Sequence, residues 1–132
     1  MSSVERPASK PRPVYLNLAR IRQPLPAIVS ILHRISGAAL FLVGVPLLLA
    51  GIQASLGSSQ SFESFRAAMT TPFAKIVLLG LAWAYLHHFC AGLRYLLLDL
   101  HRFIDLKPAR QSSVVVLIAS LVLTLVVAVR LW

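Results

Sequence analysis

The chain has 132 residues, of which 58% are hydrophobic and 13% are charged, and its formal net charge is +9. This composition is too apolar for a soluble domain, and the apolar residues are gathered in the long runs typical of membrane-spanning helices. Most of the basic residues flank those runs, as membrane topology requires, which excludes the nucleic-acid-binding function that the same charge would indicate in a soluble protein.

The N-terminal segment, residues 1–26, is predicted to be a basic cytoplasmic arm. Prolines spread along it block any stable helix: Pro7, Pro11, Pro13, Pro24 and Pro26. The segment also lacks the apolar core of a secretory signal ahead of those prolines. Two interpretations stay open for this arm: a disordered tail, or an extended segment that lies on a soluble partner or on the membrane surface.

Residues 27–132 are predicted to form one membrane domain with three helical spans. The first span, at about 28–56, begins just after Pro26, a residue compatible with the start of a helix. We expect Pro46 to bend this helix. Small residues at heptad spacing lie on one of its faces, where they allow another helix to approach closely: Gly37, Gly44 and Gly51.

The second span is predicted at about 72–99 and the third at about 113–132. A polar connection, with a short interfacial helix around residues 62–69, joins the first span to the second. Between the second and third spans we expect a basic loop, in which Pro108 prevents a continuous helix. The arm and this loop carry most of the Lys and Arg residues, so the N-terminus is expected on the cytoplasmic side and the C-terminus on the outer side.

The second span contains the stretch LHHFCAGLRYLLLD at residues 86–99, which is unusually rich in ionisable groups. A charge at the centre of a membrane helix costs roughly 2.5–3.5 kcal/mol, so these groups need polar partners. At about 1.5 Å per residue, the polar residues of the first two spans fall in the cytoplasmic leaflet, where antiparallel neighbours would meet. We interpret this cluster as a site: Ser30, His33, Arg34, His88, Arg94 and Asp99.

His88 is the favoured ligand for a haem iron. It shares one helix face with Ala84 and Gly92, and the flat space beside such small residues suits an imidazole that ligates haem. His87 points about 100° away from it. The alternative for each histidine is a hydrogen bond to a neighbouring helix. Basic residues that could pair with haem propionates favour the haem interpretation: Arg34 and Arg94.

Ser30 and Arg34 lie one helical turn apart on the same face of the first span. A hydroxyl and a guanidinium placed in this way could bind a quinone carbonyl and stabilise the negative charge that develops when the quinone accepts an electron. The alternative for Ser30 is a hydrogen bond back to its own helix.

Two motifs, SILHRISG at residues 30–37 and HxxxGxRxxxxD at residues 88–99, resemble the cytochrome b large anchor subunit of succinate dehydrogenase (complex II). The basic segment RPVYLNL at residues 12–18 is similar to the arm of bacterial members. The resemblance covers nearly the whole chain. It implies an all-α integral membrane subunit whose three transmembrane helices belong to a hetero-oligomeric helical bundle around haem b. It also implies a second small membrane-anchor subunit, an iron–sulfur subunit and a flavoprotein subunit as partners.

In that family, two membrane subunits hold one haem b between them and carry a ubiquinone site beside the iron–sulfur subunit. The resemblance implies that His88 is the axial ligand of the haem iron and that the partner anchor supplies the other ligand. The residues implied near the quinone are Ser30, Arg34 and Asp99, and those expected near the haem are His33, Arg94 and Tyr95. Tyr95 departs from the family pattern, in which histidine often follows the arginine, and a tyrosine cannot carry a positive charge.

We therefore expect a haem b-binding anchor that docks the soluble subunits and helps electrons to reach ubiquinone in the respiratory chain and the tricarboxylic acid cycle. Its expected location is the bacterial inner membrane, surrounded by lipid, with a cytoplasmic N-terminus and a periplasmic C-terminus. The sequence has no flavin or dinucleotide fingerprint, so succinate chemistry is not expected in this chain. Two alternatives remain: the anchor of a fumarate reductase that uses menaquinone, and a haem-free helical membrane adaptor.

Overall fold

The computed structural model describes Asn17 and residues 20–131, and every regular element within them is helical. The elements are α1 (Leu25–Ala39), the π-helical turn η1 (Leu40–Gly44), α2 (Val45–Gly57), α3 (Ser59–Met69), α4 (Pro72–Asp99) and α5 (Leu106–Leu131). Three continuous helices are long and apolar enough to cross a membrane: Leu25–Gly57, Pro72–Asp99 and Leu106–Leu131. This confirms the expected helical membrane architecture. Most of the predicted arm lies outside the described residues.

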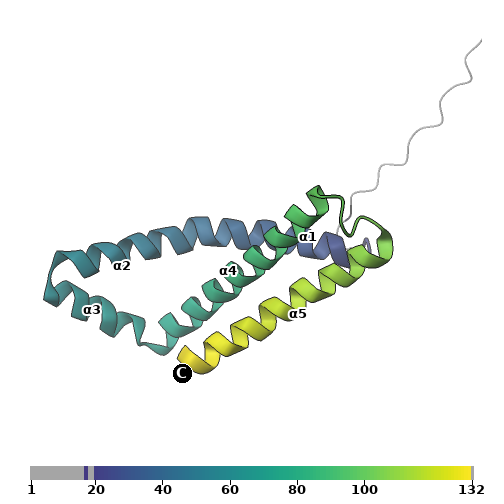
Figure 1. Cartoon of the computed structure of the whole chain (residues 1–132). Helices are drawn as coiled ribbons and strands as arrows, with labels where there is room; N and C mark the ends of the chain where they lie inside the picture. Colours follow the sequence, from purple (N-terminus) through teal and green to yellow (C-terminus); the bar gives the residue numbers. More distant parts are fainter. Residues whose placement is uncertain (1–16, 18–19, 132) are drawn as a thin grey trace, which may run out of the picture.

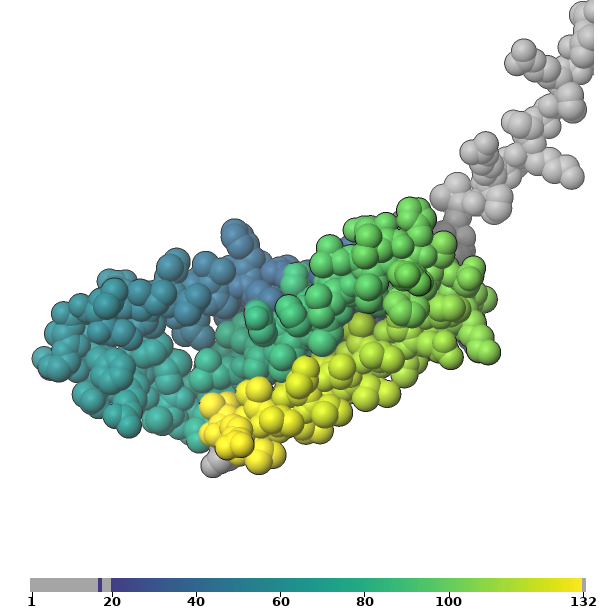
Figure 2. Space-filling view, in the orientation of Figure 1, coloured from purple at the N-terminus to yellow at the C-terminus, as the bar shows by residue number. Residues whose placement is uncertain are grey.

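Helices α4 and α5 run antiparallel, side by side, and α1 packs against both at one end of the pair (Figure 1). From there the first span continues through η1 and α2 away from the pair, and α3 turns the chain back to the start of α4. Figure 2 shows α5 in contact with α4 while α2 and α3 extend to one side. The buried core accordingly lies where α1, α4 and α5 meet, around Val29, Ala91 and Val116.

The connection between α2 and α3 is closed by a capping box. The backbone N–H of Ser61 donates to the Ser58 hydroxyl over 3.1 Å, and the backbone N–H of Ser58 donates to the Ser61 hydroxyl over 3.0 Å. The ring of Phe65 on α3 then lies against Gly51 of α2, where an added Cβ would approach it to 3.0 Å. These contacts explain why α3 forms a helix within a polar connection.

Helix α4 ends in a Schellman motif. The N–H of Arg102 donates to the Leu97 carbonyl and that of His101 donates to the Leu98 carbonyl, each over 2.9 Å. His101 takes the left-handed conformation that this motif requires, with φ at 57°. The short reversal that follows brings α5 directly alongside α4.

Pro108 occupies a position that differs from our expectation, and Pro46 adjoins an irregular turn of the first span. Helix α5 begins at Leu106, well before Ser113, and Pro108 lies in its first turn instead of in the loop. A proline is tolerated there because N–H groups of the first turn have no partner within the helix. Pro46 follows the π-helical turn η1, in which the Val45 N–H donates to the Leu40 carbonyl. This wider turn accommodates the proline ring, which would clash with a carbonyl of a regular α-helix.

Candidate functional site

The imidazole of His88 lies between α4 and α1, and its contacts come from α1. Its Nδ1 atom is 3.0 Å from the backbone carbonyl oxygen of His33. The two histidine rings are stacked, with centroids 4.0 Å apart and an interplanar angle of 13°. The ring of Tyr95, also on α4, lies near the ring of His33, with centroids 5.1 Å apart. The structure thus brings His33, His88 and Tyr95 together in one cluster.

The hydrogen bond of His88 fixes its tautomer. A carbonyl oxygen only accepts hydrogen bonds, so Nδ1 of the neutral ring must carry the proton, and the lone pair must lie on Nε2. Among the described residues, Nε2 has no hydrogen-bond partner. A histidine that donates from Nδ1 to a carbonyl and keeps Nε2 free has the arrangement of a metal-ligating histidine. His88 therefore fits the role of an axial haem ligand.

His87 has a different environment. Its side chain is fully buried on another face of α4, where its ring stacks on Trp83 with centroids 5.4 Å apart. Its Nδ1 atom is 3.5 Å from the Ser120 hydroxyl of α5. A planar macrocycle could reach this ring only if α4 and α5 were separated. The buried Nε2 of His87 has no hydrogen-bond partner among the described residues. Through Nδ1, His87 fits the other interpretation of a membrane histidine, a polar contact between neighbouring helices.

Ser30 and Arg34 both lie on α1, with polar groups that no described residue satisfies. Among the described residues, each buried serine bonds a carbonyl of its own helix, over 2.9 Å for Ser36, 2.7 Å for Ser113 and 3.0 Å for Ser120. The half-buried hydroxyl of Ser30 makes no such bond to any described residue. Arg34 is exposed and has no hydrogen-bond acceptor or ion-pair partner in the described part of the chain. Both groups are available to a ligand or to another subunit.

Asp99 is exposed in the last turn of α4 and forms no ion pair with any described residue. A negative charge at this position is unfavourable, because the carbonyl end of a helix already carries partial negative charge, at a cost of about 0.3–1 kcal/mol. Helix α4 ends at the same end of the molecule as the start of α1 (Figure 1). The carboxylate of Asp99 is thus free to meet cationic groups or protons from outside this chain.

Arg94 lies at the edge of the histidine cluster, with its guanidinium carbon 5.8 Å from the centre of the Tyr95 ring, and its pairing with haem propionates stays a prediction. Its side chain is 5% exposed and points to α5, where Nε donates to the Ser112 hydroxyl over 2.9 Å. Its Nη2 atom is 3.5 Å from the Ala109 carbonyl. The early start of α5 puts its first turns beside Arg94. The guanidinium therefore forms hydrogen bonds that link α4 to α5.

We expect Ser112→Ala to remove the hydrogen bond from Arg94 to α5 and so to lower the stability of the membrane complex. Hydrogen bonds between membrane helices contribute about 0.6 kcal/mol on average and up to about 1.7 kcal/mol, and a charged donor favours the upper part of this range. Unfolding of the purified complex measures the change. Ser55→Ala, which removes a hydroxyl bonded only within α2, is the matched control. An equal loss of stability in both variants would contradict this role of Arg94.

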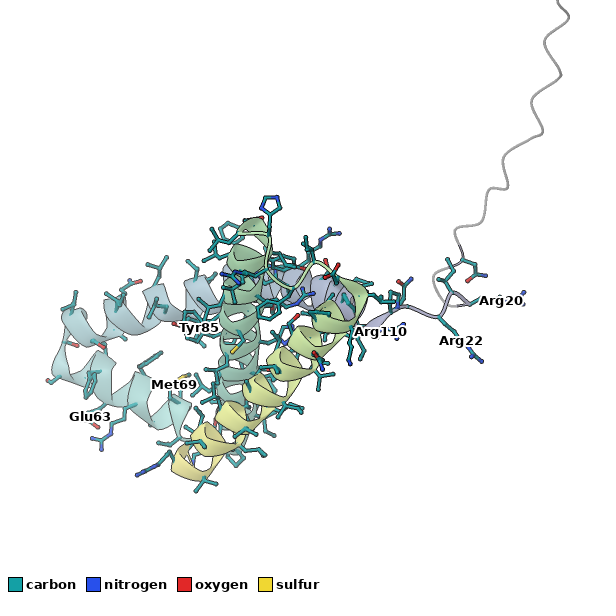
Figure 3. The ribbon with its side chains drawn as sticks, turned by 45° about the vertical axis from the view of Figure 1, so that its right-hand side comes forward. Arg20, Arg22, Glu63, Met69, Tyr85 and Arg110 are labelled. Atoms are coloured by element: carbon teal, nitrogen blue, oxygen red, sulfur yellow. The ribbon has the colours of Figure 1, made fainter. Side chains whose placement is uncertain are left out.

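A cavity lies elsewhere, between the first span, α3 and α4. It has a volume of about 800 Å³ and an almost entirely apolar lining. Figure 3 shows Tyr85 of α4 and Met69 of α3 directed into this region, while Glu63 lies on the outer side of α3. Neither Ser30 nor Arg34 lines this cavity. A quinone bound by those two residues would lie on the outer surface of α1.

Basic residues gather at the end of the molecule that also holds Ser30 and Asp99. Figure 3 shows Arg20 and Arg22 ahead of α1 and Arg110 near the start of α5 at this end. Such an asymmetry is the pattern that keeps one side of a membrane protein in the cytoplasm.

Two contacts of His88 were not predicted from the sequence, those of Ser36 and Gly37. The Ser36 hydroxyl is 3.3 Å from Nδ1, and a Cβ added to Gly37 would lie 2.8 Å from Cε1. Both follow His33 by three and four residues, so they share its face of α1. The sequence therefore indicates that Ser36 and Gly37 share a helix face with His33, but it does not show which neighbouring helix that face contacts.

Comparison with known proteins agrees with this arrangement. Residues 8–127 match the family described as succinate dehydrogenase/fumarate reductase transmembrane subunit. The chain is 34% identical to the succinate dehydrogenase cytochrome b556 subunit of Paracoccus denitrificans over 112 residues, which cover 85% of each chain. It is 32% identical to the corresponding subunit of Coxiella burnetii over 92% of this chain and 97% of the relative. The subunit of Rickettsia typhi is 26% identical over 95% of this chain and 97% of the relative.

The family match covers most of the chain, and two relatives exceed 30% identity across most of their length. The three apolar helices agree with a transmembrane subunit. The chain belongs to the succinate dehydrogenase/fumarate reductase transmembrane subunit family, as a cytochrome b membrane-anchor subunit of the enzyme complex.

Proposed function

We propose that this subunit holds haem b through His88, docks the iron–sulfur and flavoprotein subunits at the membrane, and forms part of a ubiquinone reduction site with Ser30 and Arg34. A second small anchor subunit completes the helical bundle and supplies the other axial ligand. The location proposed for the complex is the bacterial inner membrane, with the basic end of this chain in the cytoplasm and the C-terminus in the periplasm.

The observation that carries the haem proposal is the hydrogen bond from Nδ1 of His88 to the His33 carbonyl. It leaves the lone pair of the ring on Nε2, while His87, the other candidate, is fully buried and contacts Ser120 of α5. The relatives' name, cytochrome b556, supports the same assignment. A bound haem b would supply a one-electron redox centre within the membrane. His33 and Tyr95 are the described aromatic residues that would lie beside it.

The quinone proposal rests on Ser30 and Arg34, the two polar groups of α1 without partners in the described part of the chain. The guanidinium would donate to a quinone carbonyl and stabilise the negative charge that accumulates on its oxygen. The Ser30 hydroxyl would add a second donor one turn away. Asp99, exposed at the same end, would hold a proton or pass one to the reduced quinone.

The test is a reduced-minus-oxidised visible spectrum of the purified complex, together with its flavin content and its succinate:ubiquinone reductase activity. We expect a b-type α-band in proportion to flavin, and loss of both haem and membrane-bound flavin when the partner anchor gene is deleted. A complex that is fully assembled and active in the presence of ample haem, yet has no α-band, would overturn the haem assignment and support the haem-free adaptor.

A fumarate reductase anchor that uses menaquinone is the second candidate, since the matching family includes both enzymes. The two enzymes run the same chemistry in opposite directions, so the geometry of this subunit serves either. Comparing succinate oxidation by ubiquinone with fumarate reduction by menaquinol in the same purified complex distinguishes them. We expect the succinate-oxidising direction to be the faster one, in keeping with the relatives' names.

A further inference from the structure

The ring of His88 is held on three sides by a single segment of α1. The His33 carbonyl accepts from Nδ1 over 3.0 Å, and the Ser36 hydroxyl oxygen is 3.3 Å from the same atom. The His33 ring covers one face of the imidazole at 4.0 Å. The Cε1 edge faces Gly37. These contacts leave the Nε2 edge as the one through which His88 can bind a metal ion.

The hydroxyl of Ser36 acts as an acceptor toward His88. Ser36 donates its own proton to the His33 carbonyl over 2.9 Å, so its oxygen lone pairs remain for the Nδ1–H group. The Nδ1–H group is then shared between two acceptors, the His33 carbonyl and the Ser36 oxygen. Hydrogen bonding of this kind raises the basicity of the opposite ring nitrogen and therefore the strength with which it binds a metal.

Gly37 provides the space in which the ring stands. A Cβ at this position would lie 2.8 Å from Cε1 and 3.2 Å from Nδ1 of His88, distances that require the ring to move. The ring cannot rotate away freely, because the His33 ring is stacked on it and Nδ1 is bound to the His33 carbonyl. Other glycines of the chain differ: a Cβ on Gly44 would make ordinary contacts at 3.6 Å or more, and one on Gly80 would meet nothing within 4 Å.

We propose that the His33 carbonyl, Ser36 and Gly37 form an axial-ligand socket, which fixes the orientation of the His88 ring and tunes the bond from its Nε2 to iron. Ser36 and Gly37 are positioning residues that act through His88. This inference rests on the proposed ligation of haem by His88 and assigns to two further residues of α1 a role in setting the redox potential of the haem.

Two substitutions test the socket in the intact complex. Gly37→Ala is expected to displace the ring, lowering haem affinity about tenfold, since changes around a ligating histidine typically cost 10- to 100-fold. Ser36→Ala keeps the volume and removes one acceptor, so haem content is expected to stay near the wild-type value. A less basic Nε2 stabilises ferric iron less, and the midpoint potential of the haem in Ser36→Ala should therefore rise.

The controls are Gly44→Ala on the same helical span and Gly80→Ala on α4, neither of which places a methyl group near His88. Haem-to-flavin ratio, redox titration and the low-temperature α-band are measured for every variant. Wild-type spectra in Gly37→Ala together with an unchanged potential in Ser36→Ala would overturn the socket while leaving haem ligation intact. If Gly37→Ala does not assemble, the potential of Ser36→Ala decides alone. A wild-type complex without haem would overturn the proposed function and the socket with it.

Discussion

Replacement of His88 with alanine is expected to abolish the b-type α-band of the purified complex. The ring offers a single nitrogen to iron, Nε2, because its Nδ1 proton is committed to the His33 carbonyl. Alanine removes that nitrogen, and no other histidine of α4 faces the same side of the helix. Haem affinity should then fall far beyond the tenfold change expected for Gly37→Ala. The measurement is the reduced-minus-oxidised spectrum normalised to flavin.

His87→Ala is the matched control, because it removes an adjacent histidine from the same helix. This substitution leaves a cavity beside Trp83 and Ser120. The free energy of unfolding should therefore fall by about 2–5 kcal/mol, the range for truncation of large buried side chains. The α-band should remain. Addition of imidazole to a His88→Gly variant should restore part of the band, since a free imidazole can occupy the vacated space. A band lost in His87→Ala and kept in His88→Ala would reverse the assignment.

The assignment of His87 and His88 shows which features of the site could be predicted from the sequence and which could not. Helical periodicity separates His87 from His88 by about 100°, and the small residues beside His88 favoured it as the ligand. Periodicity does not show which neighbouring helix each face meets. The structure supplies this information: His87 packs against α5, while His88 meets the carbonyl of His33 on α1.

The placement of Arg94 depended on the same missing information. Estimates of depth from about 1.5 Å per residue put it in the same leaflet as Arg34, and the two were therefore grouped. Depth is a coordinate along the helix and says nothing about rotation around it. Helix α5 begins early because Pro108 fits its first turn, and this brings Ser112 opposite Arg94. Because Pro108 was expected to break the helix, Ser112 was not expected to lie opposite Arg94.

The number of spans was predictable because it depends on apolar runs alone, which are local in the sequence. The unpaired hydroxyl of Ser30 was not predictable, because a serine in a membrane helix bonds its own backbone unless the local geometry or a ligand prevents it. Its hydroxyl has no partner among the described residues, unlike those of Ser36 and Ser113. This difference between similar serines strengthens the quinone proposal more than the motif alone does.

Replacement of Arg34 with alanine is expected to lower succinate:ubiquinone reductase activity about 10- to 100-fold. A hydrogen bond to a charged group contributes about 1.5–3 kcal/mol, and each 1.36 kcal/mol corresponds to a factor of ten. Reduction of a soluble artificial acceptor by succinate should continue at the wild-type rate, because that reaction does not need the membrane site. The contrast between the two activities separates quinone binding from assembly.

Arg110→Ala is the matched control for Arg34→Ala, because Arg110 is an exposed arginine at the same end of the molecule (Figure 3). Its loss removes the same charge without touching α1, so quinone reductase activity should stay near the wild-type value. Arg34→Lys should recover part of the activity, since an ammonium retains the charge but not the forked geometry of the guanidinium. An exposed arginine within a membrane span costs roughly 2.5–3.5 kcal/mol on insertion unless it has a partner. If Arg34→Ala left ubiquinone reduction intact, that partner would have to be another subunit or a lipid, and the quinone would lie elsewhere.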